Sequence, residues 1–221
     1  MPGVHAGRLI TVEGLDGAGK STLIAGLVAL LSERGPEVEV LREPGGVEIA
    51  ERIRTRVKDP GLTVHARAEA LLYAAARAAL VEERIRPALE AGRWVLLDRF
   101  VDSSLAYQGA GRALGVAAIR SVNDFATGGL AADLTLLLRL DPAARASRMT
   151  ARGLEADRLE REGDAFFAAI AAAYDELAAS EPARFAVIDA GRAPGVVLSD
   201  ALAALAPLLP TRPDRAPDAG Y

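Results

Sequence analysis

The stretch GLDGAGKST at residues 14–22 lies directly behind the apolar run LITVE at residues 9–13. Gly14, Gly17 and Gly19 permit backbone conformations and close approaches that a Cβ atom would obstruct. The spacing GxxxxGKS, between a predicted strand and a predicted helix, is a specific signature of a loop whose amides bind phosphate oxygens. This feature constrains the fold most, because it requires a strand, a phosphate-binding loop and a helix in immediate succession.

The loop is predicted to bind a nucleoside triphosphate, with Lys20 bridging the β- and γ-phosphates and the Ser21 hydroxyl ligating Mg²⁺. The chain has 24 arginines and only two lysines, Lys20 and Lys58. A lysine in this loop therefore indicates a need for a compact ammonium that a guanidinium cannot replace. The alternative interpretation is a glycine turn before an amphipathic helix. The predicted ATP-binding residues are Gly14, Leu15, Asp16, Gly17, Ala18, Gly19, Lys20, Ser21 and Thr22.

Apolar runs of strand length alternate with longer, Ala- and Leu-rich helical segments. The predicted strands span residues 9–13, 38–42, 94–98, 134–140 and 185–189. The predicted helices span about 20–34, 47–58, 66–91, 114–127, 142–152, 161–180 and 195–206. This alternation predicts the three-layer α/β/α fold of P-loop NTPases, with a five-stranded parallel sheet. The near-continuous apolar third and fourth runs fit strands that are covered on both faces.

Length and composition predict one globular domain, residues 1–206, with an arginine-rich segment at about 145–162 and a disordered, proline-punctuated tail at 207–221. No stretch reaches the roughly 18 apolar residues of a membrane span, and the N-terminus MPGVHAGR lacks the residue order of a signal peptide. We therefore expect a cytoplasmic protein that does not interact with a membrane.

The chain has no cysteine, and its two histidines, His5 and His65, are far apart in the sequence. This composition excludes disulfides and thiolate metal sites and gives no zinc cluster, so any metal is expected to be a hard ion held by oxygen. The net charge of −4 argues against a nucleic-acid partner bound through a broadly basic surface.

A phosphate-binding loop alone leaves GTPase switches, ATPase motors and kinases open. The guanine-reading sequence NKxD is absent, which weakens the switch interpretation. Two predicted strands end in carboxylates, Asp98 and Asp141, and either is a candidate partner of Mg²⁺. Asp98 is favoured because Arg99 follows it at the carboxyl end of a strand, where ligands of open α/β sheets collect. Alternatively, Asp98 only caps the next turn.

The segment RFVDSSLAYQGAGR at residues 99–112 concentrates polar side chains after this strand. On a helix that begins near residue 102, Ser104, Tyr107 and Gln108 share one face, which suits a base and a sugar better than a core. Arg99 can form a fork to a phosphate. A second phosphate-binding group, set apart from the loop, implies two phosphorylated ligands that meet head to head.

With these motifs the chain resembles the bacterial thymidylate kinases, over about residues 8–206. The shared motifs are EGLDGAGKST at 13–22, REPGG at 42–46, LLYAAARAALVEERIRPAL at 71–89, DRFVDSSLAYQG at 98–109 and LLLRLDP at 136–142. The resemblance implies a homodimeric, Mg²⁺-dependent enzyme that transfers the γ-phosphoryl group of ATP to thymidine monophosphate (dTMP). The alternatives are another nucleotide or deoxynucleoside kinase, or a non-catalytic nucleotide-binding protein.

The resemblance also implies how the acceptor base is bound. Arg77 would hydrogen-bond the thymine carbonyl edge, and Tyr73, one turn earlier on the same helical face, would stack on the base. Ser104 would meet the polar edge of the base with Gln108 beside it, and Tyr107 would pack under the deoxyribose. Alternatively, Tyr73 and Arg77 are a core ring and a solvated arginine.

Further acceptor contacts follow from the same resemblance. Arg99 and Arg54 would hold the acceptor phosphate. Asp16 would reach the 3′-hydroxyl, unless it only makes a loop-stabilising hydrogen bond, and Glu43 would border the acceptor and the magnesium, unless REPGG is purely conformational. The predicted substrate-binding residues are Asp16, Glu43, Arg54, Tyr73, Arg77, Arg99, Ser103, Ser104, Tyr107 and Gln108, and the predicted metal-binding residues are Ser21 and Asp98.

The resemblance also implies that the arginine-rich segment at about 145–162 is a mobile lid, which is expected to supply catalytic charge. Most of its arginines fit a solvated helix surface with alternating charge. Some members of the family that this chain resembles carry a catalytic arginine in the phosphate loop, where this chain has Gly17 and Ala18. The lid must then provide it, and Arg148 and Arg152, which share a helical face, are the first candidates, followed by Arg158. The predicted catalytic residues are Lys20, Arg99, Arg148, Arg152 and Arg158.

Overall fold

The computed structural model describes residues 7–33, 36–153 and 157–209. In these ranges five parallel strands form one sheet in the order β2-β3-β1-β4-β5. They are β1 (Leu9–Glu13), β2 (Val38–Arg42), β3 (Trp94–Asp98), β4 (Leu134–Arg139) and β5 (Phe185–Asp189). The predicted fold class is confirmed, and only the fourth strand differs, ending one residue before its predicted end.

The helices follow the predicted ranges with small shifts. They are α1 (Lys20–Ser32), α2 (Glu48–Lys58), α3 (Ala66–Leu80), α4 (Arg86–Glu90), α5 (Val101–Ser104), α6 (Val116–Thr127), α7 (Pro142–Arg152), α8 (Asp164–Ser180) and α9 (Pro194–Leu205). A π-helical segment, Val81–Ile85, joins α3 to α4, so the long predicted helix is one unit with a widened turn. A second π-helical segment, Leu105–Gly111, continues α5.

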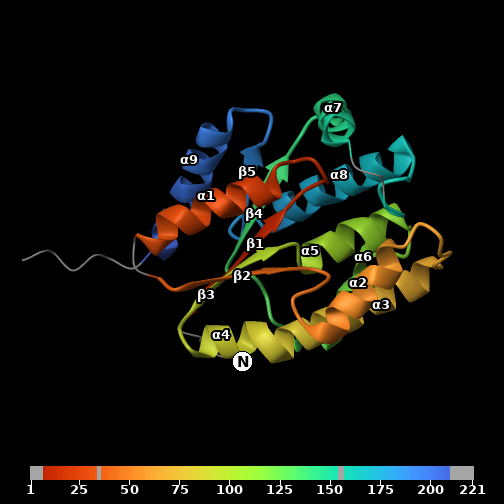
Figure 1. Cartoon of the computed structure of the whole chain (residues 1–221), viewed down its shortest axis with the longest axis horizontal. Coiled ribbons are helices and arrows are strands. Elements are labelled where there is room, and N and C mark those ends of the chain that lie inside the picture. The colour runs from red at the N-terminus through yellow and green to blue at the C-terminus, as the bar shows by residue number, and fades with distance from the viewer. Residues whose placement is uncertain (1–6, 34–35, 154–156, 210–221) are drawn as a thin grey trace, which may run out of the picture.

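Helices cover both faces of the sheet (Figure 1). On one face α1 and α9 pack over a core that includes Ile10 and Leu96. On the other face α3, α4 and α8 cover the alternate strand residues, among them Leu9 and Leu97. Because successive strand residues point to opposite faces, strands buried on both sides must be apolar at nearly every position. No helix in the described ranges is long and apolar enough to cross a membrane.

The carboxyl ends of three strands bring the predicted site segments together. Asp98 at the end of β3 is in register with Val12 of β1 and Arg42 of β2. The phosphate-binding loop, the REPGG turn and the segment after β3 therefore leave the sheet side by side. The loops at this edge are where ligands of open parallel sheets bind.

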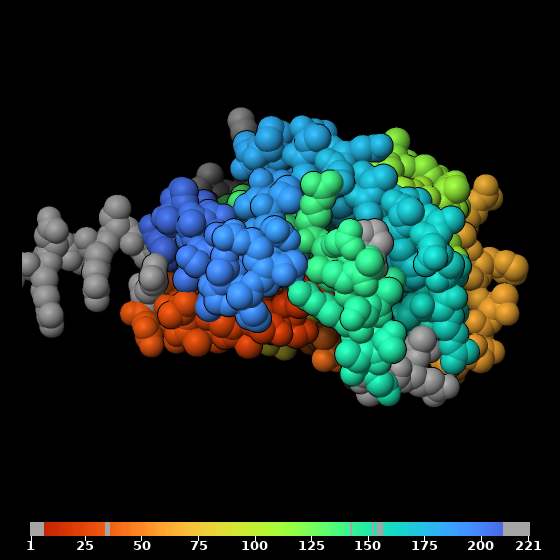
Figure 2. Space-filling model, turned by 90° about the horizontal axis from the view of Figure 1, so that it is seen from above, coloured from red at the N-terminus to blue at the C-terminus, as the bar shows by residue number. Residues whose placement is uncertain are grey.

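The arginine-rich segment lies over the same edge. Figure 2 shows α7 on the face seen from above, between α9 and α8. Asp141 begins this helix, because its side chain accepts hydrogen bonds from the amides of Ala143 at 2.9 Å and Ala144 at 3.3 Å. Asp141 is thus a helix cap. At the other end of the chain, Ala206–Leu208 form a short 3₁₀ turn, and the rest of the predicted tail, residues 210–221, lies outside the described residues.

Candidate active site

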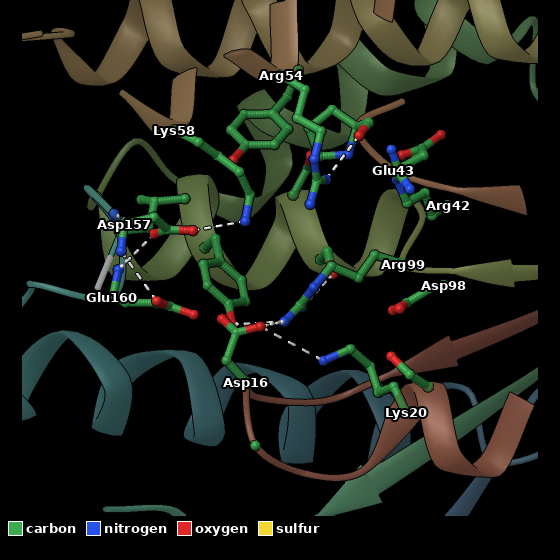
Figure 3. Close-up of a pocket in the computed structure, with 18 of the residues that line it drawn as sticks. Asp16, Lys20, Arg42, Glu43, Arg54, Lys58, Asp98, Arg99, Asp157 and Glu160 are labelled. Atoms are coloured by element: carbon green, nitrogen blue, oxygen red, sulfur yellow. Dashed lines mark hydrogen bonds and ion pairs between the residues drawn. The ribbon is translucent and has the colours of Figure 1, made fainter. Parts of the chain in front are cut away.

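A cavity of about 490 Å³ opens at this edge of the sheet, and most of the predicted site residues line it (Figure 3). They are Asp16, Gly17, Gly19, Lys20, Ser21, Thr22, Glu43, Arg54, Tyr73, Arg77, Asp98, Arg99, Ser103, Ser104, Tyr107, Gln108 and Arg148. Gly14, Leu15, Ala18 and Arg158 do not line the cavity, and the side chain of Arg152 is outside the described part of the structure.

The phosphate-binding loop closes around its lysine. Lys20 is 7% exposed, and its Nζ donates to the carbonyl oxygens of Gly14 and Leu15, each at 3.2 Å. Burial and the nearby Arg99 lower the pKa of Lys20 to about 8. A Cβ at Gly14, whose φ is +130°, would lie 2.4 Å from the carbonyl oxygen of Leu138, so only glycine fits there. The loop thus presents a desolvated cation to the cavity.

Arg99 connects this loop to the opposite wall. Its Nη2 donates to Asp16 Oδ1 at 2.8 Å and its Nη1 to Ser103 Oγ at 3.1 Å, while its guanidinium lies 5.1 Å from the ring centre of Tyr107. The backbone φ of Arg99 is +69°, a strained conformation for a residue with a side chain. Burial favours the neutral form of Asp16, but Arg99 and Lys20 outweigh it and hold the pKa of Asp16 below its usual range. Figure 3 shows Asp16 between the two cations.

Two acidic side chains at the strand ends have buried oxygens without a partner among the described residues. They are Asp98 Oδ1 and Glu43 Oε1. Both residues line the cavity, and the amide of Glu43 donates to the Asp98 carbonyl at 2.9 Å, which holds the two segments together. A buried carboxylate oxygen is expected to find a hydrogen-bond donor or a cation. These atoms and the Ser21 hydroxyl are oxygen donors of the kind that Mg²⁺ prefers.

The described residues contain no group of three or more acidic or histidine side chains that could hold a metal ion by themselves. Mg²⁺ in nucleotide sites is commonly held by one or two protein oxygens, with phosphates and water completing its coordination. Asp98 and Ser21, which both line the cavity, therefore fit an ion that arrives with a nucleotide.

Arg77 lies on α3, and its side chain is fully enclosed. It is 1% exposed, and its Nε donates to Glu43 Oε2 at 2.7 Å, its Nη1 to Ser104 Oγ at 2.9 Å, and its Nη2 to the carbonyl oxygen of Phe100 at 3.0 Å. Nη1 also donates to Asn123 Oδ1. Burial raises the pKa of Glu43, and Arg77 opposes this rise. The alternative of a solvated arginine is wrong, and Asn123 is a buried partner that the sequence motifs did not reveal.

The wall opposite the phosphate-binding loop is basic. The Nη1 of Arg54 donates to the carbonyl oxygen of Pro44 at 2.9 Å, and Figure 3 shows its guanidinium pointing toward Arg99. Lys58, at the end of the same helix α2, also lines the cavity and pairs with Asp157 at 2.6 Å. The sequence motifs gave Lys58 no role. The scarcity of lysine in this chain was a signal for it, since both lysines, Lys20 and Lys58, point into this cavity.

The predicted lid arginines lie in different surroundings. Arg148 contacts the phosphate-binding loop, because its Nη1 donates to the Gly17 carbonyl at 3.3 Å, and its Nη2 donates to the Ala190 carbonyl, in the loop after β5, at 2.8 Å. Arg158 turns away from the cavity and pairs with Glu69 of α3 at 2.6 Å. Arg148 is therefore the described lid arginine that already touches the loop.

The fold and the cavity together define a class of protein. A parallel sheet with a lysine-bearing phosphate loop, facing a second cationic wall across one cavity, is the arrangement of a P-loop kinase that joins two phosphorylated ligands. The family model described as thymidylate kinase matches residues 12–201.

Individual relatives agree with that match. A thymidylate kinase from Desulforudis audaxviator is 49% identical over 210 residues, which cover 94% of each chain. One from Clavibacter sepedonicus is 52% identical over 185 residues, covering 84% of this chain and 88% of the relative. The crystal structure of thymidylate kinase from Ehrlichia chaffeensis superposes with a TM-score of 0.73 at 28% identity, covering 90% of this chain and 98% of that one. The chain belongs to the thymidylate kinase family.

Proposed function

We propose that this chain transfers the γ-phosphoryl group of ATP to the 5′-phosphate of dTMP and releases ADP and thymidine diphosphate, in the cytoplasm. The observation that carries the proposal is that three cations, Lys20 in its phosphate loop, Arg54 of α2 and Arg99 after β3, line one cavity. Such a cavity suits a donor phosphate chain on one side and an acceptor phosphate on the other. The family to which the chain belongs supports dTMP as the acceptor.

The reaction needs charge and alignment more than proton transfer. An oxygen of the acceptor phosphate forms a bond to the γ-phosphorus, and the bond from that phosphorus to the oxygen bridging it to ADP breaks. The attacking oxygen is already anionic, so no general base is required. Lys20 and Arg148 are assigned to the donor phosphates, and Arg54 and Arg99 to the acceptor phosphate, which reduces the repulsion between the two polyanions.

Mg²⁺ is proposed as the cofactor, held by the Ser21 hydroxyl and the unpartnered Oδ1 of Asp98. When bound, it neutralises charge on the β- and γ-phosphates and helps to align them. Glu43, whose Oε1 is the second unpartnered oxygen, lines the same cavity and would border the acceptor and the ion.

The acceptor nucleoside is proposed to lie against the helices that carry Tyr73 and Tyr107. Tyr73 would stack on the base and Tyr107 would pack under the deoxyribose, with Asp16 near the 3′-hydroxyl. Arg77, Ser104 and Gln108 would line the polar edge of the base. The guanidinium nitrogens of Arg77 already donate hydrogen bonds to protein acceptors. A direct contact with the base would therefore require one of these N–H groups to be shared between its protein acceptor and the base.

Lid closure is assigned to residues 145–162. Arg148 contacts the loop, Arg158 is anchored on Glu69, and Arg152 lies between them in sequence. Closing this segment over ATP would exclude water and so suppress hydrolysis.

A homodimer is proposed through the layer of α2, α3 and α6. Exposed apolar side chains occur on each of these neighbouring helices, namely Ile49, Leu71 and Phe125, the last with 93% of its surface exposed. Exposed apolar side chains on helices that pack side by side indicate an interaction surface. Analytical ultracentrifugation is expected to show a dimer for the wild type and a monomer for Phe125→Asp.

The activity is tested by ADP release from Mg-ATP in the presence of thymidine, dTMP, dUMP, CMP or AMP. Strong stimulation by dTMP alone is expected. Stimulation by a different nucleotide would indicate another nucleotide kinase, and ATP binding without any stimulation would indicate a nucleotide-binding protein.

A further inference from the structure

The carboxylate of Glu69 is a buried junction between the acceptor pocket and the lid. Glu69 lies on α3 and is 0% exposed. Its Oε1 accepts a hydrogen bond from Gln108 Nε2 at 2.9 Å, and its Oε2 accepts one from Arg158 Nη2 at 2.6 Å. Arg112 donates to both oxygens at 3.3 Å. None of the sequence motifs assigned this residue a role, and Glu69 itself does not line the cavity.

The contact with Glu69 determines which way the Gln108 amide faces. A side-chain amide has a donating NH₂ group and an accepting oxygen, whereas an ionised carboxylate that pairs with two arginines only accepts. The NH₂ group of Gln108 must therefore face Glu69. Its oxygen then points the other way, and no described residue donates to that oxygen. Since Gln108 lines the cavity, the structure offers a ligand a fixed acceptor at this point.

Two further residues that line the cavity, Tyr73 and Ser104, have side chains that suit a pyrimidine. Tyr73 lies one turn after Glu69 on α3, and Ser104 lies one turn before Gln108, and all but Glu69 line the cavity. Because Ser104 Oγ accepts from Arg77 Nη1 at 2.9 Å, its own proton is free to donate. The polar edge of the pocket therefore presents one fixed acceptor and one donor beside each other.

We propose that Glu69 is a specificity-positioning residue, which holds the Gln108 amide so that its oxygen accepts the N3–H of thymine. Cytosine carries an unprotonated acceptor at N3 and an amino group at C4, so its edge has the opposite pattern of donors and acceptors. Two acceptors would face each other and the pocket would reject it. This inference rests on the proposed function, because it assumes that a pyrimidine monophosphate is the acceptor.

The test compares kcat/KM for dTMP, dCMP and dUMP in the wild type, Glu69→Gln and Glu69→Asp. The side chain introduced by Glu69→Gln can donate or accept a hydrogen bond, so the Gln108 amide is free to exchange the positions of its NH₂ group and its oxygen. Aspartate keeps the charge for Arg158 but withdraws the carboxylate from Gln108. Both variants are expected to lower the dTMP/dCMP ratio by about tenfold or more, the effect of one mispaired buried polar group. The dTMP/dUMP ratio should stay unchanged, because uracil has the same N3–H.

The dTMP/dCMP and dTMP/dUMP ratios distinguish a changed orientation of the Gln108 amide from a general loss of structure. Release of Arg158 would slow the enzyme equally with all three acceptors and cancel in each ratio. Glu39→Gln, at a carboxylate that also pairs with two arginines but lies away from the cavity, is the matched control and should change neither ratio. In the double variant with Gln108→Leu, the substitution at Glu69 should have no further effect on the dTMP/dCMP ratio.

A dTMP/dCMP ratio that stays at the wild-type value in folded Glu69→Gln and Glu69→Asp would overturn the inference, whatever the absolute rates. A drop of both ratios together would also overturn it, because it would show a general loosening of the pocket. A wild type that phosphorylates none of the three acceptors would instead contradict the proposed function, so the two failures are distinguishable.

Discussion

Arg99 and Asp16 are paired across the cavity, with Arg99 Nη2 2.8 Å from Asp16 Oδ1. The pair joins the phosphate loop to the segment after β3, two parts of the chain that are 83 residues apart. Lys20 Nζ lies 3.8 Å from the same Asp16 oxygen. Lys20 and Arg99 therefore share one carboxylate, which keeps the two cations close despite their mutual repulsion.

Replacing Arg99 by lysine is expected to lower kcat/KM for dTMP by about 10²-fold, because an ammonium cannot contact Asp16, Ser103 and a phosphate at once in the way that a planar fork does. Steady-state kinetics check this. Arg120→Lys, at an exposed ion pair with Glu181, is the control and should retain wild-type kinetics. Full activity of Arg99→Lys would show that only the charge is needed.

Replacing Arg77 by alanine is expected to abolish dTMP binding while sparing ATP binding, measured by calorimetry on the folded protein. It should also lower the free energy of unfolding by about 3–5 kcal/mol, because it leaves Glu43 buried without its ion-pair partner. Adding Glu43→Gln should recover part of the stability but not the binding of dTMP. Equal loss of ATP and dTMP binding would contradict the assignment of Arg77 to the acceptor.

Glu13 is expected to make stability depend on pH. Burial, with a contribution from Asp102, raises the pKa of Glu13 from 4.5 to about 7. Between pH 4.5 and 7 Glu13 keeps its proton in the folded protein, whereas the unfolded chain has lost it. The protonated Glu13 therefore contributes to the free energy of unfolding in full below pH 4.5, and this contribution is lost as the pH rises through 7. The shift corresponds to roughly 3 kcal/mol.

Urea unfolding of the wild type and Glu13→Gln at several pH values measures this effect. The difference between the two free energies of unfolding should change across the window from pH 4.5 to 7 and be flat outside it. A constant difference would mean that Glu13 titrates at its ordinary pKa despite its burial.

Replacing Lys58 by methionine is expected to raise KM for dTMP several-fold, because it removes a cation that lines the cavity beside Arg54 and its 2.6 Å contact with Asp157. Stability should change by less than about 1 kcal/mol, since the pair is partly exposed. Kinetics and thermal unfolding test both statements. Arg67→Met, at an exposed position of α3 outside the cavity, should leave KM unchanged.

The strands and the phosphate loop were predictable because their signals are local. Continuous apolar runs such as WVLLD belong to strands buried on both faces, and the spacing of Gly14, Gly19 and Lys20 admits few backbones. Helix ends were less predictable. The helix expected from residue 161 begins at Asp164, because residues 158–161 form turns and Gly163 precedes the first helical residue.

The sequence by itself determined the fold class, the phosphate loop and the residue types around the cavity, because each is set by periodicity or by neighbours a few positions apart. The tertiary structure alone decided their partners. The enclosure of Arg77 by Asn123, the contact of Lys58 with Asp157 and the fixed amide of Gln108 on Glu69 join side chains 39 to 99 residues apart. Such contacts depend on how the helices pack on the sheet, and no local pattern encodes the resulting distances and desolvation.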